Sequence, residues 1–260
     1  MEKITKIPKI IHYCWFGGNP LPEMAQRCIA SWKKYCPDYE IVEWNEDNFD
    51  ININDYVKEA YKAKKWAFVS DVARLYALVN YGGIYMDTDV EVIKPLDELL
   101  LYEAFSGFES PTQIPTGLMA CEKGHRMFVE LLNDYEGSHF VRDDGSIDLT
   151  TNVTRITNYC LKYDLKLNNE LQCVNGFTLL PRDYLCPKDH VTKKINITKN
   201  TFTIHHFDGS WHSDEDYYVE RIMKKIKIPG GSYIAKVIGV AKYRGVKTAL
   251  RETIGWLKRK

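Results

Sequence analysis

The chain lacks several features that mark membrane-spanning or secreted proteins. Its 260 residues contain no run of about 18 uncharged apolar residues, the length that a bilayer-crossing helix requires. The N-terminal sequence M-E-K-I-T-K is polar and has no apolar signal-peptide core. The seven cysteines form no C-x-x-C pair, and their odd number disfavours a complete set of disulfides, while their spacing disfavours a zinc site. These absences favour a cytoplasmic protein.

Acidic residues are scarce at the C-terminal end, although the formal net charge is zero. Residues 221–260 hold twelve Lys or Arg and one acid, whereas residues 1–220 hold 23 basic and 34 acidic residues. Apolar residues recur in the basic part with helical spacing, at Val246, Leu250, Ile254 and Leu257. Such a basic amphipathic helix is typical of proteins that lie on an anionic membrane surface, although packing on the rest of the chain is an open alternative. We therefore expect a domain of residues 1–228 and a basic helical segment of residues 229–260, peripheral on the inner face of the plasma membrane. No nucleic-acid-binding motif is present, so nucleic acid is not an expected partner.

The first sixty residues predict alternating strands and helices. Residues 7–18 and 39–44 favour strands, and residues 22–35 between them have helical character. With 45% hydrophobic residues, the chain has ample material for a core. Strands that alternate with helices indicate an α/β fold with a mainly parallel sheet.

Residues 66–89, W-A-F-V-S-D-V-A-R-L-Y-A-L-V-N-Y-G-G-I-Y-M-D-T-D, predict a helix, a turn and a buried strand. One helical face is apolar, through Phe68, Val72, Leu75, Tyr76 and Val79. Ser70 or Asp71 has the side chain of a helix N-cap, and Gly82 stands where a left-handed C-cap would fall. After the turn at Gly83, the apolar residues 84–86 predict a strand that ends at Asp87 and Asp89.

The two aspartates indicate a cation site. Asp87 and Asp89 are separated by one residue at the end of a strand that we expect to be buried. Two such carboxylates repel each other and lose hydration unless a cation lies beside them. Oxygen ligands suit Mg²⁺ or Mn²⁺, which often keep coordination positions for substrate phosphates. Asp71 and Arg74 lie at i and i+3 on one helix face, where Arg74 could bind phosphate or sugar groups as well as form a local salt bridge.

The pattern S-D-x-x-R-x-x-x-L-x-x-x-G-G-x-Y-x-D-x-D, from Ser70 to Asp89, resembles the signature of glycosyltransferase family 32, the DXD-motif sugar transferases. That family includes yeast initiating mannosyltransferases, transferases of capsular polysaccharide and exopolysaccharide synthesis, and the glucosyltransferase domains of clostridial toxins. The resemblance implies a GT-A-type nucleotide-sugar-binding fold, with a mainly parallel central sheet flanked by helices. Family members often carry T-G-P where this chain has T-T-N, so no role is predicted for Thr151 or Asn152.

The resemblance also implies a function. It implies a metal-dependent retaining hexosyltransferase that moves a hexose from a nucleotide-sugar, with UDP as the expected nucleotide, to a glycan acceptor in capsular or exopolysaccharide synthesis. The expected acceptor is lipid-linked, because a basic peripheral helix would hold the enzyme near such lipids. Trp15 would stack on the base and Ser70 would contact nearby donor atoms. Asp71 and Arg74 would bind the donor sugar, and Asp87 would lie near the ribose and sugar.

The segment H-H-F-D-G-S-W-H, from residue 205 to residue 212, is a second candidate group. A strand that runs into a small-residue loop could complete a metal site begun by Asp87 and Asp89. The resemblance implies that His206 or Ser210 binds Mn²⁺ or Mg²⁺, with Ser210 among the donor-binding residues, and that Trp211 closes over the leaving phosphate. The alternation of side chains along a strand lets only one of His205 and His206 face inward, and the sequence leaves that choice open.

Two other functions fit parts of the pattern. M-D-T-D-V also matches the nucleophile motif of haloacid-dehalogenase-type phosphohydrolases, in which Asp87 would be phosphorylated. That motif usually opens its domain, whereas more than 80 residues precede it here. A non-catalytic carbohydrate-binding relic is the second alternative, and the intact set of Asp71, Arg74, Asp87 and Asp89 argues against it.

Overall fold

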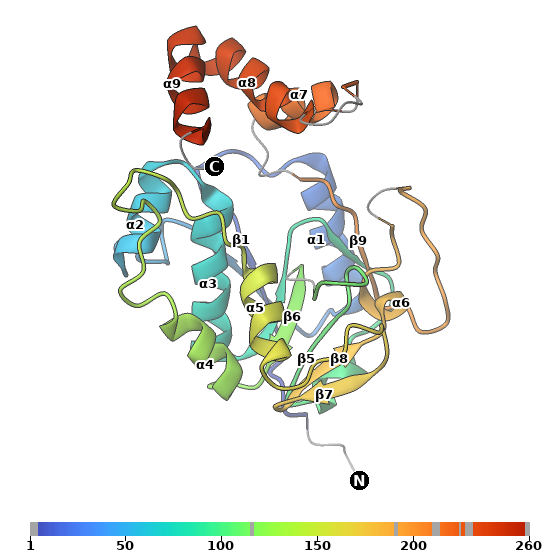
Figure 1. The fold of residues 1–260 in the computed structure, drawn as a ribbon. Helices are drawn as coiled ribbons and strands as arrows, with labels where there is room; N and C mark the ends of the chain where they lie inside the picture. Colours follow the sequence, from blue (N-terminus) through green and yellow to red (C-terminus); the bar gives the residue numbers. More distant parts are fainter. Residues whose placement is uncertain are drawn as a thin grey trace. The chain divides into compact units, whose positions relative to one another are not determined.

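A computed structural model describes residues 5–114, 117–189, 192–209, 214–223, 225–226 and 231–257 (Figure 1). The chain divides into two compact units, Met1–Asp208 and Gly209–Lys260. This division lies before the predicted boundary at residues 228 and 229, because the helix α7 (Asp214–Met223) packs against the helix that follows it.

The first unit is built on a mixed seven-stranded sheet with the order β2-β1-β3-β6-β5-β8-β7. The strands are β1 (Ile10–Cys14), β2 (Glu40–Trp44), β3 (Gly83–Met86), β5 (Ala104–Gly107), β6 (Leu118–Cys121), β7 (Gln172–Val174) and β8 (Phe177–Leu180). Only β6 and β7 run antiparallel to the other five strands of this sheet. The predicted α/β fold with a mainly parallel central sheet is therefore confirmed.

Each face of the sheet is covered by helices. Along β3, Tyr85 joins one hydrophobic cluster, whereas Ile84 and Met86 join the other, as the alternation of a strand requires. The first cluster lies under α2 (Asp55–Lys62), α3 (Trp66–Tyr81), α4 (Arg126–Asn133) and α5 (Asn152–Leu161). The second lies under α1 (Glu23–Tyr35). Because both faces are buried, β3 is apolar throughout, which the sequence had indicated.

Helix α3 begins earlier than the sequence predicts. Its first residue is Trp66, so Ser70 and Asp71 lie inside the helix and the prediction of an N-cap at either residue is wrong. The Trp66 ring packs on Tyr61, with 5.0 Å between ring centroids, and lies against Gly17. Partial burial of this indole stabilises an additional turn and leaves the Asp71 side chain free of a capping role.

A second, two-stranded sheet pairs β4 (Val90–Val92) with β9 (Thr203–His205) in antiparallel register. In this pairing Val90 lies opposite His205. Because Val90 directly follows Asp89, the pairing brings a distant histidine to the end of the central motif. The short helices η1 (Asp97–Leu101) and α6 (Arg182–Leu185) complete the first unit among the residues described.

The second unit contains α7, α8 (Gly231–Arg244) and α9 (Val246–Leu257). Helix α8 packs against both α7 and α9. The predicted C-terminal helical segment is thus present, as two helices rather than one. Across the described residues, no helix combines the length and apolar character needed to traverse a bilayer.

Candidate functional site

Two glycines direct the chain from α3 into β3. Gly82 and Gly83 have φ values of 68° and 98°, in the left-handed region that glycine adopts without strain. A Cβ at Gly82 would also lie 2.7 Å from the backbone nitrogen of Lys123, and one at Gly83 would lie 2.6 Å from the carbonyl oxygen of Ile10. No other residue fits this turn, which places Asp87 at the carboxyl end of β3.

The backbone then fixes a tight turn that carries both aspartates. The N–H of Asp87 donates to the carbonyl oxygen of Gly117 at 2.8 Å, and the N–H of Val90 donates to the carbonyl oxygen of Asp87 at 3.0 Å. The Asp89 carboxylate accepts a bond from the backbone N–H of Asp208 at 2.8 Å. The main chain therefore fixes the turn, a backbone N–H holds the Asp89 carboxylate, and the Tyr85 hydroxyl donates to Asp87 Oδ1 at 2.8 Å.

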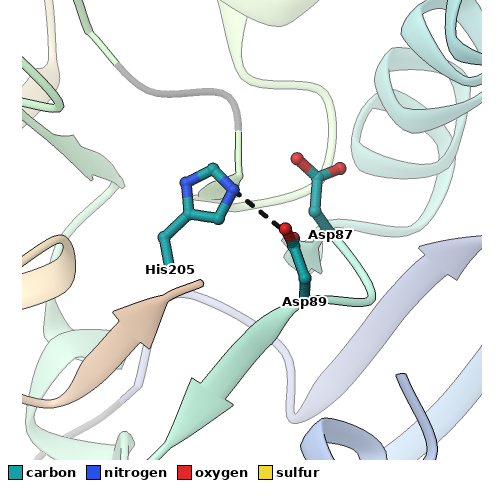
Figure 2. A group of neighbouring side chains, drawn as sticks. All are labelled: Asp87, Asp89 and His205. Atoms are coloured by element: carbon teal, nitrogen blue, oxygen red, sulfur yellow. Dashed lines mark ion pairs between the residues drawn. The ribbon is translucent and has the colours of Figure 1, made fainter. Parts of the chain in front are cut away.

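Asp87, Asp89 and His205 form a candidate metal site. One ligand atom from each of these residues lies within 4.8 Å of the other two (Figure 2). His205 Nε2 lies 3.4 Å from Asp89 Oδ1. The ring of His205 rests against Gly117, where a Cβ would lie 2.9 Å from its Cε1 atom. Gly117 thus both anchors the aspartate turn and leaves room for the imidazole.

The chemistry of this group fits a divalent ion. Two carboxylates and one imidazole are accepted ligands of such ions. Within the described residues, no hydrogen bond to the buried His205 Nδ1 meets the geometric criteria, and the ring also packs on Phe207 with 4.2 Å between ring centroids. Burial alone would raise the pKa of Asp89, but the His205 ring and the Asp208 N–H lower it to about 2. The Asp89 carboxylate is consequently ionised at neutral pH.

A buried arginine lies beside the metal site. The Nη2 atom of Arg74 is 3.3 Å from Asp87 Oδ1 and 3.5 Å from Asp71 Oδ1, and the guanidinium stacks over the Tyr85 ring at 4.5 Å. Its Nε donates to the carbonyl oxygen of Ser70 at 3.2 Å. Burial opposes the charge on Arg74, but Tyr85 and the two aspartates raise its pKa above its ordinary value. The guanidinium is thus a fixed positive charge held between two carboxylates.

Asp71 is held from the other side by Asn152, for which the sequence had predicted no role. The backbone N–H of Asn152 donates to Asp71 Oδ2 at 3.1 Å, and its side-chain amide donates to the Asp71 carbonyl oxygen at 2.7 Å. The Tyr135 hydroxyl donates to Asn152 Oδ1 at 2.8 Å. Burial raises the pKa of Asp71 to about 6, against the opposing effects of Arg74 and the Asn152 N–H. A helix start at residue 152 is visible in the sequence, but its contact with α3 is not.

The two histidines of the second candidate group have different partners. His205 faces the aspartates, whereas His206 Nε2 bonds to Glu91 Oε2 at 2.7 Å. The structure thus places His205, and not the predicted His206, in the candidate metal site. This follows from the β4–β9 pairing, which directs successive side chains to opposite faces. The predicted donor contacts Ser210 and Trp211 lie outside the described residues.

The remaining predicted residues lie near these elements. Trp15 directly follows β1, is partly buried, and donates from its indole nitrogen to the carbonyl oxygen of Asn19 at 2.6 Å. Ser70 is partly buried on α3, one turn from Arg74. The structure therefore brings Asp71, Arg74, Asp87 and Asp89 into one connected group, and Ser70 joins it through its backbone.

The fold and site define an α/β protein with a possible divalent-metal site next to a buried arginine. Residues 22–106 match the family described as the glycosyltransferase sugar-binding region containing the DXD motif. This match covers about a third of the chain.

Similar proteins include two yeast enzymes. The chain is 32% identical over 136 residues to inositol phosphoceramide mannosyltransferase 3 of Schizosaccharomyces pombe, a match that covers 49% of this chain and 37% of that protein. It is 30% identical over 134 residues to a mannosyl phosphorylinositol ceramide synthase of Saccharomyces cerevisiae, covering 48% of this chain and 34% of that one. The chain thus spans little more than a third of the length of these relatives.

A solved structure with a similar arrangement is a glycosyltransferase involved in the glycosylation of the major capsid of PBCV-1. It is 13% identical, with a TM-score of 0.45 over 78% of this chain and 95% of that one.

Proposed function

We propose that the protein is a metal-dependent hexosyltransferase that moves a sugar from a nucleotide-sugar donor to a glycan acceptor. The observation that carries the proposal is the convergence of Asp87, Asp89 and His205 beside the buried Arg74, in a chain whose residues 22–106 match the DXD glycosyltransferase family. A sugar donor with a diphosphate brings negative charge, which cations fixed at the end of a sheet can accept without rearrangement. The expected donor nucleotide is UDP.

In this proposal some residues bind the metal ion and others bind the donor sugar. Asp87, Asp89 and His205 hold the ion, which when bound would offset negative charge on the diphosphate. Mn²⁺ fits better than Mg²⁺, because Mg²⁺ strongly prefers an all-oxygen shell. Arg74 supplies a fixed positive charge beside the metal site, and Asp71 orients that guanidinium and accepts hydrogen bonds from the donor sugar.

Other parts of the predicted mechanism remain proposals. Trp15 would stack on the nucleotide base, with Ser70 and Ser210 contacting donor atoms and Trp211 closing over the leaving phosphate. The product would retain the anomeric configuration of the donor. One yeast relative is named as an inositol phosphoceramide mannosyltransferase and the other as a mannosyl phosphorylinositol ceramide synthase. These names support a hexose as the transferred group and a lipid-linked acceptor. Capsular or exopolysaccharide synthesis is the expected setting.

A donor screen tests the proposal. The purified protein is incubated with UDP- and GDP-sugars, with Mn²⁺ or with a chelator, and released nucleoside diphosphate and inorganic phosphate are measured separately. We expect nucleoside diphosphate release with at least one sugar donor, lost with chelator and in the Asp89→Asn variant. Activity that survives both treatments would refute the metal-dependent mechanism.

The same screen separates the two alternatives. Phosphate release from simple phosphoesters, abolished by Asp87→Asn, would favour the phosphohydrolase. Binding of glycans without turnover of any donor would favour the non-catalytic relic. The family match favours the transferase over both.

A further inference from the structure

The two C-terminal helices expose apolar side chains that a folded helical unit normally buries. On α8, Ile234 and Ile238 are 40% and 38% exposed, and on α9, Val246 and Leu250 are 65% and 59% exposed. Members of each pair are four residues apart and therefore lie on one side of their helix. We call α8 and α9 together the hairpin, and these four residues the apolar hairpin surface.

Contacts within the hairpin explain why these side chains remain outside. Among the side chains described in α8 and α9, the buried ones are mainly small, namely Gly231, Ala235, Gly239, Val240 and Ala249. Small residues let the two helices approach closely, and the Tyr233 hydroxyl also donates to the Thr253 carbonyl oxygen at 3.2 Å. Among the side chains that the structure describes, the predicted apolar face of α9 is exposed at Val246 and Leu250.

Basic residues accompany the apolar ones. On α9, Lys247 and Arg251 each directly follow an exposed apolar residue, Val246 and Leu250. Both basic residues are exposed. Since residues 221–260 contain twelve basic residues and one acid, nearly every charge in this region is positive.

We propose that the apolar hairpin surface binds an anionic lipid membrane, with its aliphatic side chains below the headgroups and its basic residues among the phosphates. A membrane interface offers apolar depth and negative charge in the same place. A second copy would bring like charges together. Nucleic acid would satisfy the basic residues but leave the aliphatic ones in water. The proposal is independent of the reaction proposed above.

Vesicle binding by the full-length protein tests this surface. Sedimentation is measured with vesicles of phosphatidylcholine alone and with vesicles containing about one third phosphatidylglycerol. We expect binding to the anionic vesicles only, weakened by added salt because exposed charges are screened. Lys247→Gln/Arg251→Gln should weaken binding about 25-fold, since each basic residue near the surface contributes about fivefold.

The aliphatic contribution needs its own variant and a matched control. Val246→Gln/Leu250→Gln should weaken anionic-vesicle binding at least about tenfold, while glutamine keeps the helix propensity near that of leucine. Ile195→Gln/Ile197→Gln changes two residues of the first unit that are 44% and 58% exposed, and should leave binding unchanged. Circular dichroism and donor hydrolysis should match the wild type in all variants.

Several results would overturn the proposal. Equal binding to neutral and anionic vesicles would show that the basic residues do not contribute to binding. No binding to either kind of vesicle would show that the surface does not bind membranes. Unchanged binding by Val246→Gln/Leu250→Gln would exclude this surface. A dimer in sedimentation velocity that this variant dissociates, without vesicle binding by the wild type, would assign the surface to a second copy instead.

Discussion

Two neighbouring histidines provide a matched pair of substitutions, His205→Ala and His206→Ala. His205 Nε2 lies 3.4 Å from Asp89 Oδ1 in the candidate metal site, whereas His206 Nε2 is engaged by Glu91 at 2.7 Å. Loss of a group that merely orients a metal ligand lowers affinity about 10- to 100-fold. Loss of the ligand itself should therefore lower Mn²⁺ affinity by at least about 100-fold, or about 2.8 kcal/mol.

His206→Ala should behave differently, because it removes a hydrogen bond outside the metal group. We expect Mn²⁺ affinity within about twofold of wild type and a loss of about 1–3 kcal/mol in the free energy of unfolding. For both variants, the Mn²⁺ affinity is measured first by calorimetric titration without donor. The Mn²⁺ concentration that donor hydrolysis requires is then measured. Loss of Mn²⁺ binding in His206→Ala, with retention in His205→Ala, would refute the assignment of the ligand.

Three further predictions follow from contacts around the site. In Gly117→Ala, the added Cβ displaces the His205 ring, so calorimetry should show Mn²⁺ affinity about 10- to 100-fold lower. In Asn152→Ala, the buried bonds to Asp71 and Tyr135 are lost, so urea unfolding should show about 2–3 kcal/mol less stability, with slower donor hydrolysis. Burial lowers the pKa of His12 from 6.5 to about 4, so the folded protein binds a proton less readily than the unfolded chain. Stability should therefore fall by about 2 kcal/mol between pH 7 and about pH 4.5, an effect absent in His12→Gln.

Matched controls separate site effects from general destabilisation. Gly107→Ala places a Cβ 3.1 Å from the carbonyl oxygen of Leu180, so it should lower stability while Mn²⁺ affinity stays unchanged. Thr151→Ala removes the N-cap of α5 and should cost about 1 kcal/mol without slowing hydrolysis. Equal Mn²⁺ affinity in Gly117→Ala and wild type, or equal hydrolysis in Asn152→Ala and Thr151→Ala, would contradict the roles given to Gly117 and Asn152.

The region from residue 66 to residue 89 was largely predictable. Its helix, turn and strand follow from apolar spacing and two glycines, all of which act over a few residues. The start of α3 was not predictable, because it depends on contacts of Trp66 with Tyr61 and Gly17. That difference moves Asp71 from a capping position into the buried group around Arg74.

The candidate site was predictable only in part. Asp71, Arg74, Asp87 and Asp89 lie within twenty residues, and the helix-turn-strand pattern was enough to bring them together. Asn152 reaches Asp71 from α5, and no local pattern around residue 152 indicates that contact. Gly117 likewise has no sequence feature that predicts its place beneath the His205 ring.

The amino-acid sequence by itself determined the α/β class, the paired aspartates at the end of a buried strand, and the separation of a basic C-terminal part. These properties depend on residue spacing and composition, which act locally or as averages. The tertiary structure decided that His205 rather than His206 faces the aspartates, and that Val246 and Leu250 of α9 remain exposed. Both outcomes depend on packing between separate elements, namely the pairing of β4 with β9 and the packing of α8 against α9. Many contacts with the rest of the fold set how such elements align, so a local sequence pattern does not specify it.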